Sequence, residues 1–379
     1  MADNSKPIIA ASLDDFLQNT AAGSAATAIG NNFYGINHRQ TPTPIALNKD
    51  NYGLTFFVRP QLNMQKANLR NNRLFTPLLS NDPTSYQTII RCLLDPRIIG
   101  GYPSGIEEDG VDFQGTSDVN CPFVDNRQAF FPILSNHLKS ISGWPDVRSP
   151  ILTSKEGAYQ ETHSMVDGIA LNYTAYDIDA TFRSSRGDPI MSLFYYWVHY
   201  MSAVFEGTLL PYPDMIVENE IDYQCRIYRL VLDSEKRFVQ KIAATGVCIP
   251  SNIPIGGAFD FSTEKPYNNI DGDITIQFKC NGAIYQDDIL IQEFNKTVAI
   301  FNPSMDDNQF GRNNGTSDSS DGSAIKRDMM KIDRDHLALF NNRGYPYINP
   351  DTYELGWYVS KDLYAKKLQA LQDFQRSFS

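Results

Sequence analysis

The sequence lacks any long uninterrupted apolar run. No stretch approaches the length of about eighteen uncharged apolar residues that a membrane-spanning helix needs. Residues Met1–Lys6 also lack the basic segment, followed by an apolar one, that marks a secretory signal. We therefore expect synthesis in the host cytoplasm and no insertion into a membrane.

Cysteine is scarce and has no recurrent spacing. The chain has five cysteines, an odd number, and none of them forms a Cys-x-x-Cys pair. Neither a disulfide framework nor a structural zinc site has its spacing here. The sequence predicts reduced, buried thiols at Cys92, Cys121, Cys225, Cys248 and Cys280.

Basic residues are outnumbered by acidic ones, 33 Lys and Arg against 44 Asp and Glu, so the net charge is −11. Affinity for nucleic acid comes chiefly from Lys and Arg that neutralise phosphate, so this balance argues against a protein that wraps nucleic acid. The 379 residues, 12% of them aromatic, instead predict a globular chain of two or three domains with a sizeable core.

Histidine is also sparse, and no His-Glu-x-x-His or His-x-His motif is present, which leaves a metal hydrolase unsupported. We interpret His199 as a packed or interfacial residue, and the closeness of Glu161 to His163 as chance. The five histidines are His38, His137, His163, His199 and His336.

Other candidate sites each lack a necessary part. The turn Gly100–Gly105 has no Lys-Ser/Thr for a phosphate loop. Asp306-Asp307-Asn308, with Asp318 and Asp321, lacks the ligand spacing and terminal Glu of an EF-hand. Glu107-Glu108 and Asp287-Asp288 would serve a glycosidase only if the fold brought them across a cleft. We predict no enzyme, no cofactor, and no catalytic, cofactor-binding or metal-binding residue.

One strongly patterned helix is present. Asp188 and Pro189 are a predicted N-cap and first helical residue, and Gly207 follows the last turn. Tyr195, Tyr196, His199 and Tyr200 occupy the reverse face, which we expect to meet something other than the core. The continuous apolar stripe consists of Ile190, Leu193, Phe194, Trp197, Val198, Met201, Val204 and Phe205.

Strand-like segments surround this helix. Residues 172–182 precede it, residues 222–232 and 238–244 form a predicted hairpin, and residues 273–280 alternate strictly between apolar and polar. Another apolar run, residues 289–294, follows in this strand series. Elsewhere we predict a short helix opened by residues 12–15, a strand at 54–60, a helix from Asp82-Pro83 to Asp95-Pro96, a loop-rich region at 100–160 and a terminal helix from Lys361.

The segment from Tyr173 to Phe294 resembles the tail-tube family of contractile-tailed bacteriophages and related injection machines. The resemblance is carried by the helix 188–205, the hairpin 223–244, the Pro- and Gly-punctuated segment 247–256 and the alternating strand 274–280. It implies an α+β, mainly β fold, in which a small β-sandwich or barrel with a flanking amphipathic helix assembles into six-fold rings that stack into a tube. A ring of six would carry a formal charge of 6 × −11 = −66.

The chain is longer than an ordinary tube subunit, and the extra length predicts adaptor elements. We expect an extended N-terminal arm at 1–50, an N-terminal adaptor region at 51–164, the tail-tube-like β domain at 165–302, a polar linker at 303–328, and a C-terminal extension with a terminal helix at 329–379. Such additions favour a specialised ring with different partners on its two faces.

The resemblance therefore implies a structural protein of the virion tail, at the tube-initiating or baseplate end, through which DNA passes without specific binding. Its partners would be further copies of itself in a ring and the neighbouring tube, baseplate or neck proteins. Two alternatives stay open: a neck or tail-completion adaptor ring, and a carbohydrate-binding or carbohydrate-degrading tail protein, which the many aromatic residues and scattered carboxylates suggest.

Overall fold

The computed structural model describes residues 52–97, 121, 123–168, 174–218, 220–259, 273–306, 329–340 and 343–377. The predicted arm at 1–50, with its short helix, and most of the linker at 303–328 lie outside these residues. The chain divides into two compact units. The first comprises the described parts of 1–54, 229–242 and 286–379, and the second comprises those of 55–228 and 243–285.

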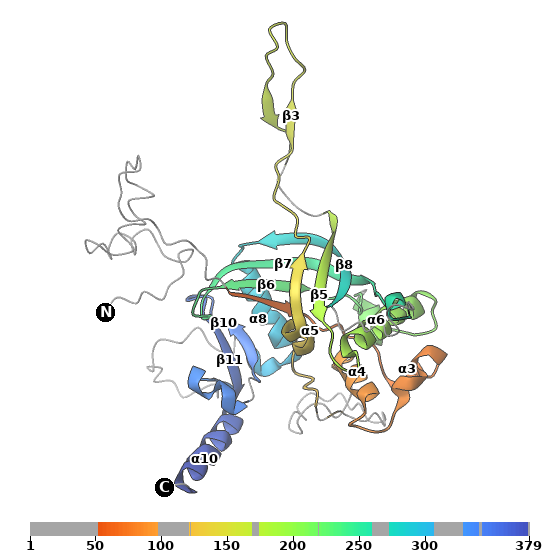
Figure 1. Ribbon diagram of the computed structural model, residues 1–379, viewed down its shortest axis with the longest axis vertical. Coiled ribbons are helices and arrows are strands. Elements are labelled where there is room, and N and C mark those ends of the chain that lie inside the picture. The colour runs from red at the N-terminus through yellow and green to blue at the C-terminus, as the bar shows by residue number, and fades with distance from the viewer. Residues whose placement is uncertain are drawn as a thin grey trace, which may run out of the picture. The chain divides into compact units, whose positions relative to one another are not determined.

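The main sheet has six strands in the order β1-β6-β7-β8-β5-β2 (Figure 1). The ladders β2–β5, β5–β8 and β7–β8 are antiparallel. At its end β1 reaches toward the β2 side, because Val58 forms a bridge with Phe130, just before α5 and β2. The predicted mainly-β fold, a barrel-like sheet with a flanking helix, is confirmed. The strands are β1 (Tyr52–Phe57), β2 (Leu138–Ser142), β5 (Ala175–Arg183), β6 (Ile227–Leu232), β7 (Val239–Asn252) and β8 (Asp273–Tyr285).

Helix α6 (Pro189–Phe205) packs on this sheet, and its bounds follow from the sequence. Pro189 supplies the first helical residue, and Gly207 stops the helix at φ 74°, a left-handed conformation that costs glycine little. The shorter helices of the same unit are α3 (Lys66–Leu69), α4 (Tyr86–Leu94), α5 (Pro132–His137) and α7 (Pro213–Glu218), with 3-10 turns η1 (Arg73–Leu79) and η2 (Gly256–Phe259).

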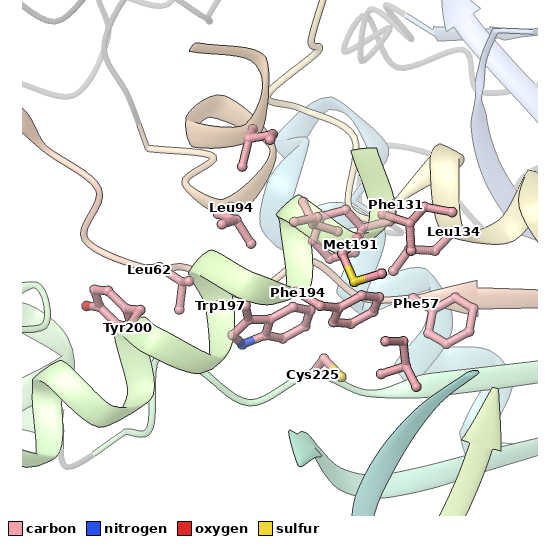
Figure 2. Packing of buried hydrophobic residues seen from close by; sticks show 14 of the residues in the cluster. Phe57, Leu62, Leu94, Phe131, Leu134, Met191, Phe194, Trp197, Tyr200 and Cys225 are labelled. Atoms are coloured by element: carbon pink, nitrogen blue, oxygen red, sulfur yellow. The ribbon is translucent and has the colours of Figure 1, made fainter. Parts of the chain in front are cut away.

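Aromatic rings of α6 form the centre of the core (Figure 2). Phe194 stacks on Trp197 at 5.8 Å between ring centroids, and it meets Phe278 of β8 edge-on at 5.6 Å. The indole N–H of Trp197 donates to the backbone oxygen of Tyr223 at 3.0 Å, so the buried ring has its polar atom satisfied. The helix is thereby held against the sheet by both apolar burial and one directed bond.

The other unit has its own sheet and core. Its strand order is β10-β11-β9, and a small cluster of Ile332, Phe340, Val359 and Tyr364 is buried there. Tyr364 of the terminal helix stacks on Phe340 at 5.3 Å between centroids. The elements are α8 (Ile289–Phe301), η3 (Pro303–Met305), β9 (Met329–Lys331), η4 (Arg334–Phe340), β10 (Tyr345–Ile348), β11 (Leu355–Ser360) and α10 (Lys361–Ser377).

Several local predictions were wrong at the level of single elements. The run 289–294 is the first part of helix α8 rather than a strand. Helix α4 begins after Ser85, whose side chain caps the Thr88 N–H, because the Asp82 carboxylate is engaged by Thr84 in the preceding turn. Within the predicted loop region 100–160, residues 151–153 instead form a strand that pairs with residues 164–166.

The predicted apolar stripe of α6 is also only partly correct. Ile190, Leu193, Phe194 and Trp197 are buried, but Phe205 at the end of the helix is 93% exposed. Tyr200, assigned to the reverse face, is fully buried and donates its hydroxyl proton to Asp222 at 2.5 Å. A tyrosine can satisfy its one polar atom inside a core, and the period of the sequence does not reveal that partner.

Candidate assembly surfaces

Three of the histidines considered as catalytic candidates have structural neighbours. His137 contacts the backbone oxygen of Ile133 at 2.9 Å, and His336 contacts the Tyr364 hydroxyl at 2.8 Å. His199 lies beside Tyr195, and burial lowers the pKa of its imidazole. Over the part of the chain that the structure describes, no three His, Cys, Asp or Glu side chains are placed to hold a metal ion.

The acidic candidates have local structural partners. Glu161 accepts the Tyr159 N–H at 2.7 Å within its own turn, and Asp288 accepts the Tyr353 hydroxyl at 2.6 Å at the start of α8. The candidates His38, Glu107-Glu108, Gly100–Gly105, Asp318 and Asp321 lie outside the described residues. Among the described helices, none is both long and apolar enough to cross a bilayer.

A hairpin of β3 (Ile151–Thr153) and β4 (Ser164–Val166) extends away from the main sheet (Figure 1). Its strands pair antiparallel, and the ladder continues beyond them through the Asp167 N–H to the Pro150 oxygen at 2.8 Å. Every residue from 146 to 168 is exposed to solvent. The Thr153 and Ser164 hydroxyls lie 3.1 Å apart across the two strands. An isolated two-stranded hairpin is at best marginally stable in water.

The hairpin carries apolar side chains on both of its faces. Ile151 lies opposite Val166, and Leu152 lies opposite Met165. Because directly paired residues point to the same face and successive residues alternate, these two pairs lie on opposite faces. Their exposed fractions are 64%, 68%, 53% and 64% in the same order. Burial of one face alone would leave the apolar side chains of the other face in water.

The second surface is the solvent face of β2, β5 and β8. Along β5 and β8 its cross-strand pairs are polar: Asp177 forms an ion pair with Lys279 at 2.8 Å, and the hydroxyls of Thr181 and Thr275 are 3.1 Å apart. Lys139 of β2 forms an ion pair with Asp273. The opposite face of the same strands holds the buried residues Ile178, Ala180, Phe182, Ile274, Ile276, Phe278 and Cys280.

This polar face is balanced in charge. Three basic side chains, Lys139, Arg183 and Lys279, are exposed there with three acidic ones, Asp177, Asp179 and Asp273. The excess acid of the chain is therefore not concentrated on these three strands. Exposed ion pairs such as these contribute little to stability, typically about 0–1 kcal/mol each. Their main consequence is that this face of the sheet is polar but carries no net charge.

Both surfaces could be found only in part from the sequence. The alternation along residues 273–280 predicts one polar face, and the structure confirms it. The hairpin strands, three residues each, are too short for a periodic signal, and nothing in a single strand reveals that both of its faces are uncovered.

A family model described as "Putative phage tail tube protein" matches residues 8–372 of the chain. No curated protein matches this chain. Among solved structures, the chain is similar to the "anti-feeding prophage cap (AFP tube terminating cap)", with 15% identity, 42% of this chain and 82% of that chain covered, and a TM-score of 0.26. It is also similar to the "PVC sheath/tube terminator in extended state" of an extracellular contractile injection system, with 11% identity, 42% and 87% covered, and a TM-score of 0.24.

Proposed function

Because the chain belongs to the phage tail tube protein family, we propose that it is a ring-forming subunit at the baseplate end of the tail tube in a contractile particle. Copies associate head to tail around the axis, because a heterologous contact whose rotation closes generates a ring, and we expect the ring to be six-fold. Neighbouring tube and baseplate proteins then stack on its two faces.

The observation that carries this proposal is the hairpin β3–β4 with apolar side chains on both faces. Residues 146–168 are exposed throughout, and no other described part of the chain covers Ile151, Leu152, Met165 and Val166. At about 25 cal/mol per Å² of apolar area removed from water, enclosing four such side chains gives a substantial share of an interface. A neighbouring copy is the partner that a ring supplies at every position.

The polar face of β2, β5 and β8 is the surface that we assign to the channel. Its acidic and basic side chains are equal in number, so it neither attracts nor strongly repels the phosphates of a passing duplex. DNA would then move through the ring without specific binding. The first compact unit, with the buried cluster of Ile332, Phe340, Val359 and Tyr364, is suited to contact partners that an ordinary tube subunit does not have.

The hairpin ends lie close enough for a clean deletion. Because the Asp167 N–H donates to the Pro150 oxygen at 2.8 Å, residues 151–166 can be replaced by a two-glycine linker without moving the main sheet. We expect the full chain to form rings, as seen by negative-stain microscopy and mass photometry, and the deletion variant to remain monomeric with an unchanged Tm. A matched control replaces Lys155 and Glu156, two exposed polar residues of the hairpin, by alanine and should still form rings.

Two outcomes would contradict the proposal at different levels. Rings formed equally well by the deletion variant would show that the hairpin is not the contact. A wild-type chain that stays monomeric even when mixed with neighbouring tail proteins would remove the ring itself. Crosslinking in assembled particles tests the position, because crosslinks to neck proteins in place of baseplate proteins would assign the chain to the other end.

A further inference from the structure

Three cysteines lie side by side across neighbouring strands of the main sheet. Cys225, just before β6, forms an antiparallel bridge with Cys248 of β7. Cys248 is in turn the register partner of Cys280 in β8. All three thiols are free, and their residues are 4%, 0% and 0% exposed in the same order. Directly paired residues point to one face of a sheet, so the three side chains form a row in the core.

The backbone bonds identify which pair is closer. The Cys225 N–H donates to the Cys248 oxygen at 2.9 Å, and the Cys248 N–H donates back to the Cys225 oxygen at 2.8 Å. In an antiparallel sheet, a residue that bonds its neighbour on one side faces its neighbour on the other side without backbone bonds. Cys248 and Cys280 are therefore a non-hydrogen-bonded pair, the kind whose Cα atoms are about 4.5 Å apart and whose side chains are closest.

That spacing lies within the Cα separation of about 4.4–6.8 Å that disulfides span. A hydrogen bond with the Cys248 side chain, together with burial, raises the pKa of the Cys280 thiol far above its ordinary value. The Cys280 sulfur is thus protonated in the folded protein. Attack by a thiolate then requires a brief local opening of the strands, which makes formation and reduction of a bond here slow.

We propose that Cys248 and Cys280 form a latent cross-strand disulfide, reduced in the host cytoplasm and closed by a small-molecule disulfide such as oxidised glutathione once particles are released. The passage from the host cytoplasm to a released particle rests on the proposed function. In the reaction, the Cys248 thiolate attacks one sulfur of the reagent and releases one glutathione thiol. The Cys280 thiolate then displaces the second, so that two cysteines are oxidised, one reagent disulfide is reduced and two thiols leave.

Such a bond would link β7 covalently to β8, and β8 is also the neighbour of β5 in the sheet. Cys225 is the less suitable partner, since side chains of a hydrogen-bonded pair lie farther apart. Because the disulfide closes the long chain segment between positions 248 and 280, it also restricts the unfolded state. A particle that must survive outside the cell gains a sheet that resists opening.

The test uses the full chain, purified reduced and then incubated with oxidised glutathione below its Tm until the intact mass is constant. A second sample is refolded from urea in the same buffer, so that slow access to the buried thiols does not decide the result. We expect the loss of two hydrogens, a non-reduced peptide that joins Cys248 to Cys280, and a Tm rise of about 5–10 °C that dithiothreitol reverses.

Matched variants test whether the disulfide joins Cys248 and Cys280 rather than other thiols. Cys225→Ala and Cys92→Ala should retain the link and the Tm rise, and Cys280→Ala should lose both. The proposal is overturned if neither sample contains the Cys248–Cys280 peptide, or if the product is a Cys225–Cys248 link or a glutathione adduct. The peptide map is read on monomers and rings alike, so a failure of ring assembly, seen by microscopy, leaves this result independent.

Discussion

Asp95 is a buried carboxylate whose ionisation is expected to lower the stability of the protein at neutral pH. Its side chain is fully buried. One carboxylate oxygen accepts the Tyr212 hydroxyl at 2.7 Å and the Met64 N–H at 2.9 Å, and the other accepts the Arg97 N–H at 2.9 Å. Burial raises the pKa of Asp95 to about 6, and these hydrogen bonds and the charge of Arg59 offset that rise only in part.

The direction of the pH effect follows from this raised pKa. Between the ordinary value of 3.8 and about 6, the folded protein holds a proton that the unfolded chain has already released. The stability that this group contributes is therefore fully present below about pH 4 and is lost as the pH rises through about 6. A rise of this size corresponds to about 3 kcal/mol of unfolding free energy lost by pH 8.

Asparagine has nearly the shape of the protonated carboxyl and never ionises. Its NH2 group cannot accept a hydrogen bond, so either the Met64 N–H or the Arg97 N–H loses its acceptor, at a cost that does not depend on pH. We therefore expect the stability of Asp95→Asn relative to wild type to rise by up to about 3 kcal/mol from pH 4 to pH 8. The assay is urea unfolding at a series of pH values, followed by the fluorescence of tryptophan, since Trp197 is buried in the same unit. A difference between variant and wild type that stays constant within about 0.5 kcal/mol from pH 4 to pH 8 would refute the reasoning.

Asp214 provides a control of opposite sign. Its slight burial acts to raise its pKa, but the hydrogen bond and charge of Arg97 outweigh this and lower it. Stability from this pair is present above the ordinary carboxyl pKa and is lost as the pH falls. Asp214→Asn should therefore be less stable than wild type at neutral pH and approach it in acid, the reverse of the Asp95 variant.

Two further predictions concern burial that the sequence pattern does not reveal. Phe205→Ser should change the free energy of unfolding by no more than about 0.5 kcal/mol, because that side chain is 93% exposed. Phe194→Ser should lower it by at least about 3 kcal/mol, because that side chain is 0% exposed. Thermal unfolding of the two variants measures the difference, and equal losses would contradict the assigned exposures. Asn295→Ala should lower the free energy of unfolding by about 2–4 kcal/mol, since the side-chain amide donates to the Ile348 oxygen at 2.7 Å and accepts the Ile348 N–H at 2.9 Å. Lys296→Ala, on the exposed side of α8, should be nearly neutral in the same measurement.

Local patterns accounted for much of the fold. The stripe from Ile190 to Trp197, with Pro189 before it and Gly207 after it, sufficed for helix α6, because helix period and end signals are properties of neighbouring residues. The strict alternation of residues 274–280 likewise sufficed for β8 and for its polar face. Family resemblance in the segment 173–294 led to the tail tube family, which the match over residues 8–372 confirms.

Pairing across the sheet decided the rest, because it joins residues far apart in the chain. No local pattern places Cys248 between Cys225 and Cys280, or gives the Tyr200 hydroxyl its partner Asp222. In the same way, the two apolar faces of the hairpin arise only once Ile151 lies opposite Val166 and Leu152 opposite Met165. The sequence by itself determined most of the main elements and the family. The tertiary structure determined which side chains are exposed, paired or buried, since burial depends on what the rest of the chain covers.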